Sequence, residues 1–477
     1  MKIYYLLHFF WLLGAIACGT FAFASHDYNF LLFCAILLWV NNIQYALRHF
    51  KERSYFFFFN LTFFVFLLGR PIISLLQGWD WVKYVHTYSS EADVWLGLKL
   101  MVLSLASIGL GGIGGNLLCK KLRKDTHLKS ASNSFFLYNL KWISMCIFGV
   151  ALISTICGSA EKMTFVLGHS YVEYYSSFQS KLPYIVYVFS TFLQPSLCLY
   201  LITYPPKKKV YPILVIYVIS TIPDLISGER NPFVLSVLFS LIYFIYRDYI
   251  GDRKKWIGAF EKTALIAGIP VGICVLGLLN YVREGTSASF NNVFVIIVDF
   301  FFKQGVTFAW YCSGLGILYK LPQPANYTFG SIADYFKYGS LAQIFFGAEA
   351  LQEGNNLQRA LNGNSMAHHL SYALLGQEYL NGHGCGSSYL LELYADYQES
   401  GVFIFSVLLG AFLIVSFFLA KRNSIFGAIM LLTINGILFM PRAEVMGGLG
   451  FILRIPFWCT FLVCVIGGLL FYRRYRQ

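Results

Sequence analysis

A segment rich in histidine and carboxylate in the last quarter of the chain is the clearest candidate for chemistry. It holds His368, His369 and His383, and Glu392 follows the glycine cluster within 382–386. A neutral imidazole or a carboxylate accepts a proton from a hydroxyl group, so these residues are candidates for a general base. The alternative for the histidines is local hydrogen bonding within the loop. The histidines lack the regular spacing of a zinc site, and we predict no bound metal.

Arginines near the ends of apolar runs form the second group of candidates. Such an arginine is costly unless it snorkels, is paired or faces a water-filled cavity. The planar guanidinium binds phosphate oxygens bidentately and stays charged at physiological pH. We therefore predict a lipid-diphosphate site that contains Arg70, Arg230, Arg283 and Arg442. The alternative for each is a local ion pair, such as Arg230 with Glu229. Arg442 with Glu444 is another such pair.

The elements that position these residues are membrane helices. The chain has 477 residues, of which 57% are hydrophobic and 12% charged, against about a quarter charged in soluble domains. Its apolar runs predict an all-α polytopic membrane protein with about twelve transmembrane helices. The runs lie at 4–24, 29–47, 55–76, 94–118, 138–157, 184–204, 210–227, 231–247, 262–280, 401–420, 424–440 and 451–471.

Basic residues mark every second connection between these runs. Examples are the clusters at 48–53, 120–129 and 207–209 and the C-terminal arginines at 473–476. The positive-inside rule assigns these clusters to the cytoplasm, so we predict that both termini are cytoplasmic. The net charge of +13 then reflects topology, and no nucleic-acid partner is implied.

The longest hydrophilic stretch, 281–400, is predicted to lie on the outer side. The run 293–319 within it is apolar but carries Asp299, Lys303 and Gln304. A full crossing there would put the following basic cluster outside, so we predict a re-entrant or interfacial segment. Long structured loops are usually functional, and we expect short helices in this one. The simplest domain division is one transmembrane domain over 1–477.

The sequence resembles one family in particular. The run His369–Tyr372, followed by Gly382–Tyr397 and Gly401, is similar to the signature after the large outer loop of O-antigen and capsule polysaccharide polymerases, the Wzy family. Gly228-Glu229-Arg230 resembles their upstream arginine motif. The related O-antigen ligases carry a His-Asn pair just after the glycines. Here Ser387-Ser388 stands in that place, which favours the polymerase and leaves the identity of the base open.

The resemblance implies a GT-C-like, metal-independent membrane glycosyltransferase without a cofactor. It would join polyprenyl-diphosphate-linked oligosaccharide repeat units at the outer face of the bacterial cytoplasmic membrane and release polyprenyl diphosphate. The arginines would neutralise the departing diphosphate. His369 would act as the general base, with Glu392 or His368 as alternatives. Tyr372 and Tyr389 would stack on sugar rings. A chain-length regulator and a flippase are the expected protein partners.

Two other functions remain open at this point. A ligase that transfers the finished glycan to another acceptor would share nearly all of this chemistry. A flippase or transporter of lipid-linked oligosaccharide would place its polar residues near mid-span and show matching halves. The polar residues here gather at the outer face instead, which favours an enzyme.

Overall fold

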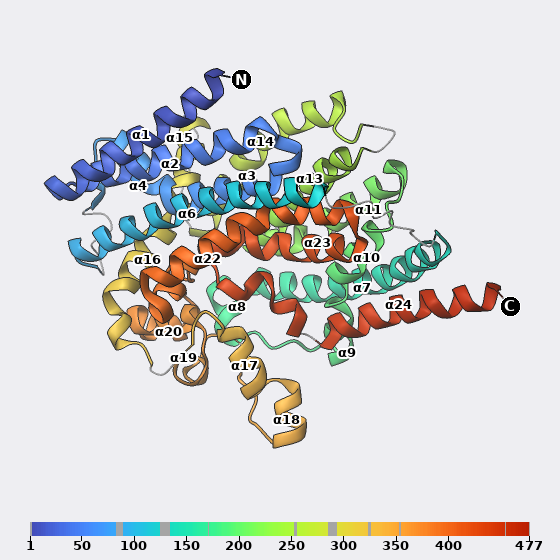
Figure 1. The fold of residues 1–477 in the computed structure, drawn as a ribbon. Coiled ribbons are helices and arrows are strands. Elements are labelled where there is room, and N and C mark those ends of the chain that lie inside the picture. Colours follow the sequence, from blue (N-terminus) through green and yellow to red (C-terminus); the bar gives the residue numbers. More distant parts are fainter. Residues whose placement is uncertain are drawn as a thin grey trace. The chain divides into compact units, whose positions relative to one another are not determined.

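The computed structural model describes the chain except for residues 1, 83–88, 125–133, 170, 252–254, 285–292, 323–325, 353, 454 and 477. The described residues form helices and connecting segments, with no strand among them (Figure 1). Within this described part, twelve helical segments are long and apolar enough to cross a membrane. The prediction of an all-α polytopic membrane protein is therefore confirmed.

The twelve candidate spans agree with the predicted runs except near the two ends of the predicted outer loop and at the C-terminus. Val293–Lys320 qualifies by length and hydropathy, whereas the last helix contributes a shorter apolar stretch, Phe457–Leu470. The predicted span 401–420 is preceded by a helix and not by a loop. The helical segment Tyr389–Arg422 contains one non-helical residue, Gln398, where two helices join across a kink. This kink lies three residues before Gly401 and separates the site residues from the predicted span.

The chain forms two compact units. The first contains Met1–Lys124, Phe260–Val415 and Gly436–Gly447. Its helices are α1 (Lys2–Ser25), α2 (Tyr28–Arg48), α3 (Phe50–Phe63), α4 (Gly69–Leu76), α6 (Glu91–Lys124), α14 (Ala259–Glu284), α15 (Val293–Gln304), α16 (Val306–Ile317), α17 (Gly330–Tyr338), α18 (Ser340–Phe346), α19 (Leu357–Asn362), α20 (Met366–Leu375), α21 (Gln377–Leu380) and most of α22 (Tyr389–Arg422).

The second unit contains Asp125–Ala259, Ser416–Asn435 and Gly448–Gln477. Its helices are α7 (Ser134–Gly168), α8 (Tyr171–Ser177), α9 (Tyr184–Ser190), α10 (Leu193–Leu201), α11 (Lys207–Ile219), α12 (Ile222–Ile226), α13 (Arg230–Ile250), most of α23 (Ser424–Phe439) and α24 (Ile455–Arg476). Helix α7 packs against α9, α10 and α24. The prediction of one transmembrane domain over 1–477 stays a prediction.

A π-helical turn directly precedes Arg70 in the first unit. Helix α3 passes into the π-helical segment η1 (Phe64–Leu68), and α4 begins at Gly69. Pro71 has no backbone N–H to donate to the preceding turn, which disfavours regular α-helical bonding here. Single π turns within helices are common at functional sites. Arg70 therefore lies in the first turn of α4, directly after an irregular turn.

Helices α15 and α16 meet at Gly305 against this same turn. A Cβ atom at Gly305 would lie 2.7 Å from the backbone nitrogen of Arg70, so only glycine allows this close approach. At the far ends of the pair, Ile296 of α15 packs on Gly277 of α14, and Gly316 of α16 packs on Asp93 at the start of α6. The break between α15 and α16 thus lies beside Arg70.

Candidate functional site

His369 lies on α20 and is almost completely buried, with 1% of its surface exposed. Its Nδ1 is 3.1 Å from the Tyr327 hydroxyl, which also donates to the Pro322 carbonyl at 3.2 Å. Nε2 has no partner in hydrogen-bond geometry among the described residues. Burial lowers the pKa of His369, although Asp334 and the Gly363 carbonyl act in the opposite direction. The ring is therefore neutral at physiological pH.

His368 has both ring nitrogens in contact with neighbours. Nε2 lies 3.3 Å from an Arg359 guanidinium nitrogen, and Nδ1 lies 2.8 Å from the Tyr379 hydroxyl. Because a guanidinium only donates, Nε2 is the acceptor and Nδ1 carries the proton. Burial, with the nearby Arg359 charge, lowers the pKa of His368 to about 4. These contacts give His368 a structural role. The Tyr379 hydroxyl in turn donates a hydrogen bond to the Asn356 carbonyl.

Glu392 lies in the first turn of α22 with no exposed surface. Its two carboxylate oxygens accept hydrogen bonds from the Ser387 hydroxyl at 2.7 Å and from the Val445 backbone N–H at 2.8 Å. The carboxylate therefore joins the end of the glycine cluster to the loop after α23.

A second carboxylate, Glu444, lies on the same loop. It accepts hydrogen bonds from Ser331 at 2.7 Å and from Ser365 at 2.8 Å. These donors lie on α17 and at the N-cap of α20. The described hydrogen bonds of Glu444 thus connect it to the outer segment, whereas those of Arg442 lead to Gln304.

Two aspartates fix the segment that carries Tyr327. Asp396 accepts hydrogen bonds from the backbone N–H groups of Tyr327 and Thr328, at 3.2 and 2.6 Å. Asp334 accepts from the backbone and the side-chain amide of Asn364, at 2.9 and 2.8 Å. These bonds hold the hydroxyl of Tyr327 beside His369.

The side chains at the end of the glycine cluster are buried. Only 6% of the surface of Cys385, within the glycine cluster, is exposed. Its backbone N–H donates to the Ser371 hydroxyl at 2.9 Å, and burial raises the pKa of its thiol to about 12. Cys385 is buried because the segment folds back onto α20. Cys385 is a poor target for topology labelling.

Arg70 and Arg442 converge on the break between α15 and α16. Arg442 donates to the Gln304 backbone carbonyl and side-chain oxygen, both at 3.4 Å, and lies 5.7 Å from the centre of the Phe66 ring. Phe66 is one helical turn before Arg70. The Arg70 guanidinium lies 4.5 Å from the centre of the Phe302 ring. No carboxylate among the described residues pairs with it, and its Nε is buried without a partner.

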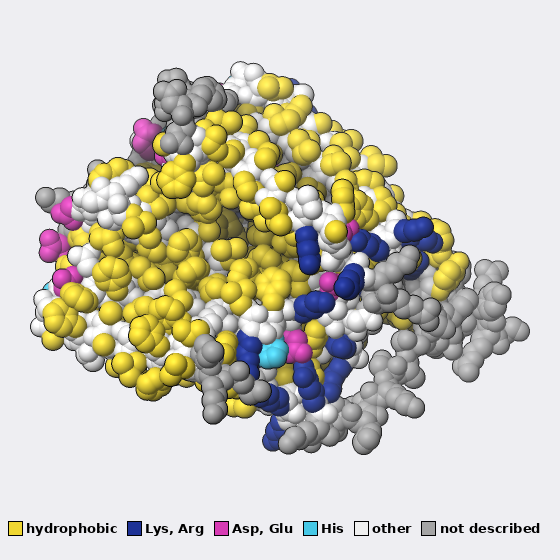
Figure 2. Space-filling view, turned by 90° about the horizontal axis from the view of Figure 1, so that it is seen from above, with side chains coloured by type: hydrophobic (Ala, Val, Ile, Leu, Met, Phe, Trp, Pro, Cys, Tyr) yellow, Lys and Arg dark blue, Asp and Glu magenta, His cyan; other side chains and the backbone are white. Residues whose placement is uncertain are grey.

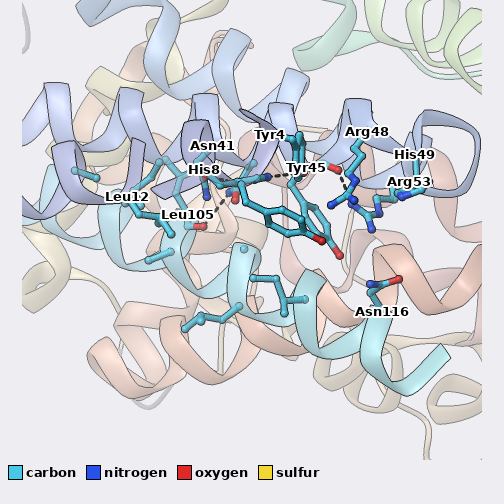
Figure 3. Close-up of a pocket in the computed structure, with 18 of the residues that line it drawn as sticks. Tyr4, His8, Leu12, Asn41, Tyr45, Arg48, His49, Arg53, Leu105 and Asn116 are labelled. Carbon is cyan, nitrogen blue, oxygen red and sulfur yellow. Dashed lines mark hydrogen bonds between the residues drawn. The ribbon is translucent and has the colours of Figure 1, made fainter. Parts of the chain in front are cut away.

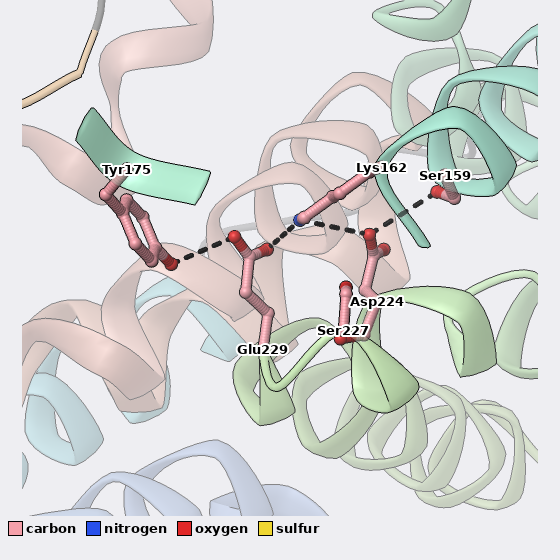
Figure 4. A network of polar contacts seen from close by, with 6 residues as sticks. All are labelled: Ser159, Lys162, Tyr175, Asp224, Ser227 and Glu229. Atoms are coloured by element: carbon pink, nitrogen blue, oxygen red, sulfur yellow. Dashed lines mark hydrogen bonds and ion pairs between the residues drawn. The ribbon is translucent and has the colours of Figure 1, made fainter. Parts of the chain in front are cut away.

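The turn that carries Arg230 belongs to the second unit. Gly228 has φ of 95°, a conformation that favours glycine, and Arg230 is the first residue of α13. Glu229 forms an ion pair with Lys162 and accepts a hydrogen bond from the Tyr175 hydroxyl at 2.9 Å (Figure 4). Lys162 also lies 3.3 Å from Asp224. The described ion pair of Glu229 is thus with Lys162 and not with its neighbour in sequence.

The remaining predicted site residues lie apart from these contacts. Arg283 belongs to α14, and its side chain lies outside the described part of the chain. Tyr389 is fully buried, and its hydroxyl is 2.7 Å from that of Ser104, so it offers no surface to a sugar ring. Tyr372 is partly exposed and packs edge-to-face on Tyr379. Sugar stacking stays a prediction for Tyr372.

Several residues of this cluster were not among the predicted site residues. Tyr327, Ser331, Ser365 and Asp334 lie in ordinary hydrophilic sequence, and no spacing signal distinguishes them. Glu444 and Asp396 were visible as charges next to predicted spans. A carboxylate close to a membrane edge usually needs a partner, and that signal could have identified them as site residues.

Fold and site define a polytopic membrane protein with a buried polar cluster at the junction between its late hydrophilic segment and the span that follows. The model of the family described as O-antigen polysaccharide polymerase Wzy matches residues 4–475. The chain belongs to this family, whose activity is that of a glycosyltransferase-type polymerase. Comparisons with the curated proteins and with the solved structures found no match.

Proposed function

We propose that this protein joins polyprenyl-diphosphate-linked oligosaccharide repeat units at the outer face of the bacterial cytoplasmic membrane. The glycan of the donor moves to a hydroxyl of the acceptor glycan, and polyprenyl diphosphate leaves. The family match supports a polymerase. The observation that carries the donor assignment is the convergence of Arg70 and Arg442 on the break at Gln304–Gly305.

A partly buried guanidinium without a carboxylate partner is suited to an external anion. A buried cation that lacks an opposite charge is unfavourable, so a bound diphosphate would stabilise Arg70. The same fixed positive charges would stabilise the negative charge that develops on the leaving diphosphate. Arg230 and Arg283 stay proposed members of this site.

His369 is the proposed general base. Both nitrogens of His368 and both carboxylate oxygens of Glu392 already have hydrogen-bond partners, whereas Nε2 of His369 has none among the described residues. If Nδ1 donates to Tyr327, whose hydroxyl donates to Pro322, Nε2 is left as the acceptor nitrogen. It would take the proton of the acceptor hydroxyl as the new glycosidic bond forms and the bond to the diphosphate breaks. The proposed reaction uses no metal.

The proposed orientation has both termini in the cytoplasm. The alternation of basic clusters supports it. The α15–α16 pair supports a re-entrant hairpin, because its two ends pack on the end of α14 and the start of α6, which face the same side in that orientation. Chain-length regulator and flippase partners are proposed from the family alone.

Deletion of the gene tests the function against its rivals. We expect surface glycan to collapse to a single repeat unit, analysed by gel electrophoresis. Full-length polymer that accumulates without attachment would instead indicate a ligase. Complete loss of the exported glycan would indicate a flippase. Restoration of the normal length distribution by the plasmid-borne gene is the control.

A further inference from the structure

A groove between α1, α2, the start of α3 and α6 lies away from the residues discussed above. Its volume is about 840 Å³, within the range of small-molecule sites, about 300–1,000 Å³. All of its lining residues belong to the first unit. In the space-filling view, hydrophobic side chains cover most of the visible face, and Lys and Arg gather toward one side of it (Figure 2). The groove combines both chemistries.

One end of the groove is basic. Arg48, Arg53, Lys120 and Arg123 line it, and Glu52 is the one carboxylate among the lining residues. Glu52 lies 3.2 Å from Arg123, so its charge is already matched. Figure 3 shows Arg48, His49 and Arg53 together beside the rings of Tyr4 and Tyr45. This end therefore has an excess of positive charge.

The positive charge of the buried Arg53 has no carboxylate partner among the described residues. Only 5% of its surface is exposed. One guanidinium nitrogen donates to the Tyr45 carbonyl at 2.6 Å, the group stacks 3.8 Å from the centre of the Tyr45 ring, and Nε is buried without a partner. No carboxylate of the described residues forms an ion pair with Arg53. Burying a charge without an opposite charge is costly, so an anion from outside would stabilise it.

Arg48 is also held by rings. Its guanidinium lies 4.4 Å from the centre of the Tyr4 ring and 4.9 Å from that of Tyr5. Aromatic faces orient a guanidinium without neutralising it. Its N–H donors therefore remain suitable for phosphate oxygens, which an arginine binds bidentately.

The other end of the groove is apolar. It is lined by Leu12, Ala15, Ile16, Gly19, Cys34, Leu38 and Leu110. Along α1, the lining from Tyr4 to Gly19 covers about 22 Å at 1.5 Å per residue. One leaflet contributes half of a hydrocarbon core about 30 Å thick. The groove therefore has the length for one hydrocarbon chain of a single leaflet.

We propose that this groove binds an anionic phospholipid of the leaflet on the side of the basic clusters. The phosphate headgroup lies against Arg48 and Arg53, and one acyl chain follows α1 and α6 past Leu110. The site is separate from the diphosphate site at Arg70, which the proposed function uses. Its occupancy holds α1 to α2 and α6.

The test measures phosphatidylglycerol bound to the protein purified in a neutral detergent, by native mass spectrometry. Phosphatidylcholine serves as the neutral lipid. A charge near a membrane surface is worth about 1 kcal/mol, so we expect roughly fivefold weaker binding of phosphatidylglycerol for each of Arg48→Gln and Arg53→Gln. Lys51→Gln removes a neighbouring charge outside the groove and should leave binding unchanged.

A second variant keeps all charges. Leu110→Trp fills the apolar part of the groove and should reduce binding of phosphatidylglycerol, whereas Leu117→Trp, on an exposed part of the same helix, should not. Equal binding of both lipids, or unchanged binding in Leu110→Trp, would overturn the proposal. So would full displacement by inorganic phosphate, or preferential binding of a polyprenyl phosphate, which would make the lipid carrier the occupant.

Discussion

The first unit contains two polar regions that differ in whether their charged groups have partners within the protein. Around Glu392 and Glu444, each described carboxylate oxygen accepts from a serine or a backbone N–H. At the groove of α1, α2 and α6, Arg48 and Arg53 contact aromatic rings and a carbonyl, and neither forms an ion pair with a carboxylate of the described residues. In the first region, the hydrogen bonds of the carboxylates to serines and a backbone N–H hold neighbouring segments together. A region with unmatched cations is prepared for a ligand.

Arg70 and His369 differ from Glu392 and Glu444 in their hydrogen bonding. Each keeps a buried nitrogen without a described hydrogen-bond partner. Leaving such a group unsatisfied costs about 1–3 kcal/mol. This difference supports the proposed roles of Arg70 and His369.

The largest effect is expected from His369→Ala. Loss of a general base costs about 10²–10⁴-fold in rate. Polymer synthesis from purified lipid-linked repeat units, assayed by gel, should fall by that factor while the protein still inserts. His383→Ala, an exposed histidine of the same segment, is the control. Normal activity in His369→Ala with failure in Glu392→Ala would transfer the role to the carboxylate.

Arg70→Ala comes next. Removal of one group that stabilises developing negative charge costs about 10²–10³-fold. Arg70→Lys keeps the charge without the bidentate fork and should retain part of the activity. Lys99→Ala, which breaks the exposed pair with Glu399, should have little effect. Polymer of wild-type length and amount from Arg70→Ala would remove the diphosphate site.

Glu392→Ala should act on stability. It leaves the Ser387 hydroxyl and the Val445 N–H without an acceptor, which costs about 2–6 kcal/mol for the two groups together. Glu392→Gln keeps an acceptor oxygen and should lose less. Thermal unfolding in detergent measures both variants. An unchanged unfolding temperature in Glu392→Ala would contradict the structural role.

The smallest effect concerns acid stability. The pKa of His368 falls to about 4 in the folded protein, from about 6.5 in an unfolded chain. The unfolded state therefore binds the proton first, and stability is lost as the pH falls from about 6.5 towards 4, by at most roughly 3 kcal/mol. His368→Gln should flatten this dependence of the unfolding temperature, and His383→Gln should not. Parallel curves for His368→Gln and wild type would exclude this contribution.

The spans were predictable because their signal is local. A run of about 20 apolar residues specifies a membrane helix with little information from elsewhere in the chain. The site was predictable only in part. His369 and Glu392 were marked by the signature around the glycine cluster, and Arg442 by its place at a span end. Tyr327, Ser331 and Ser365 carried no such mark, since their roles come from contacts with residues far away in sequence.

By itself, the sequence determined the membrane class, most of the spans and the family resemblance. Hydropathy, the alternation of basic clusters and a compact motif are local signals that can be recognised without the tertiary structure. Only the tertiary structure decided which charges are neutralised. It paired Glu229 with Lys162, tied Glu444 to two serines, and left Arg53 buried among rings. Such pairing depends on which helices pack together, and adjacency in sequence does not specify it.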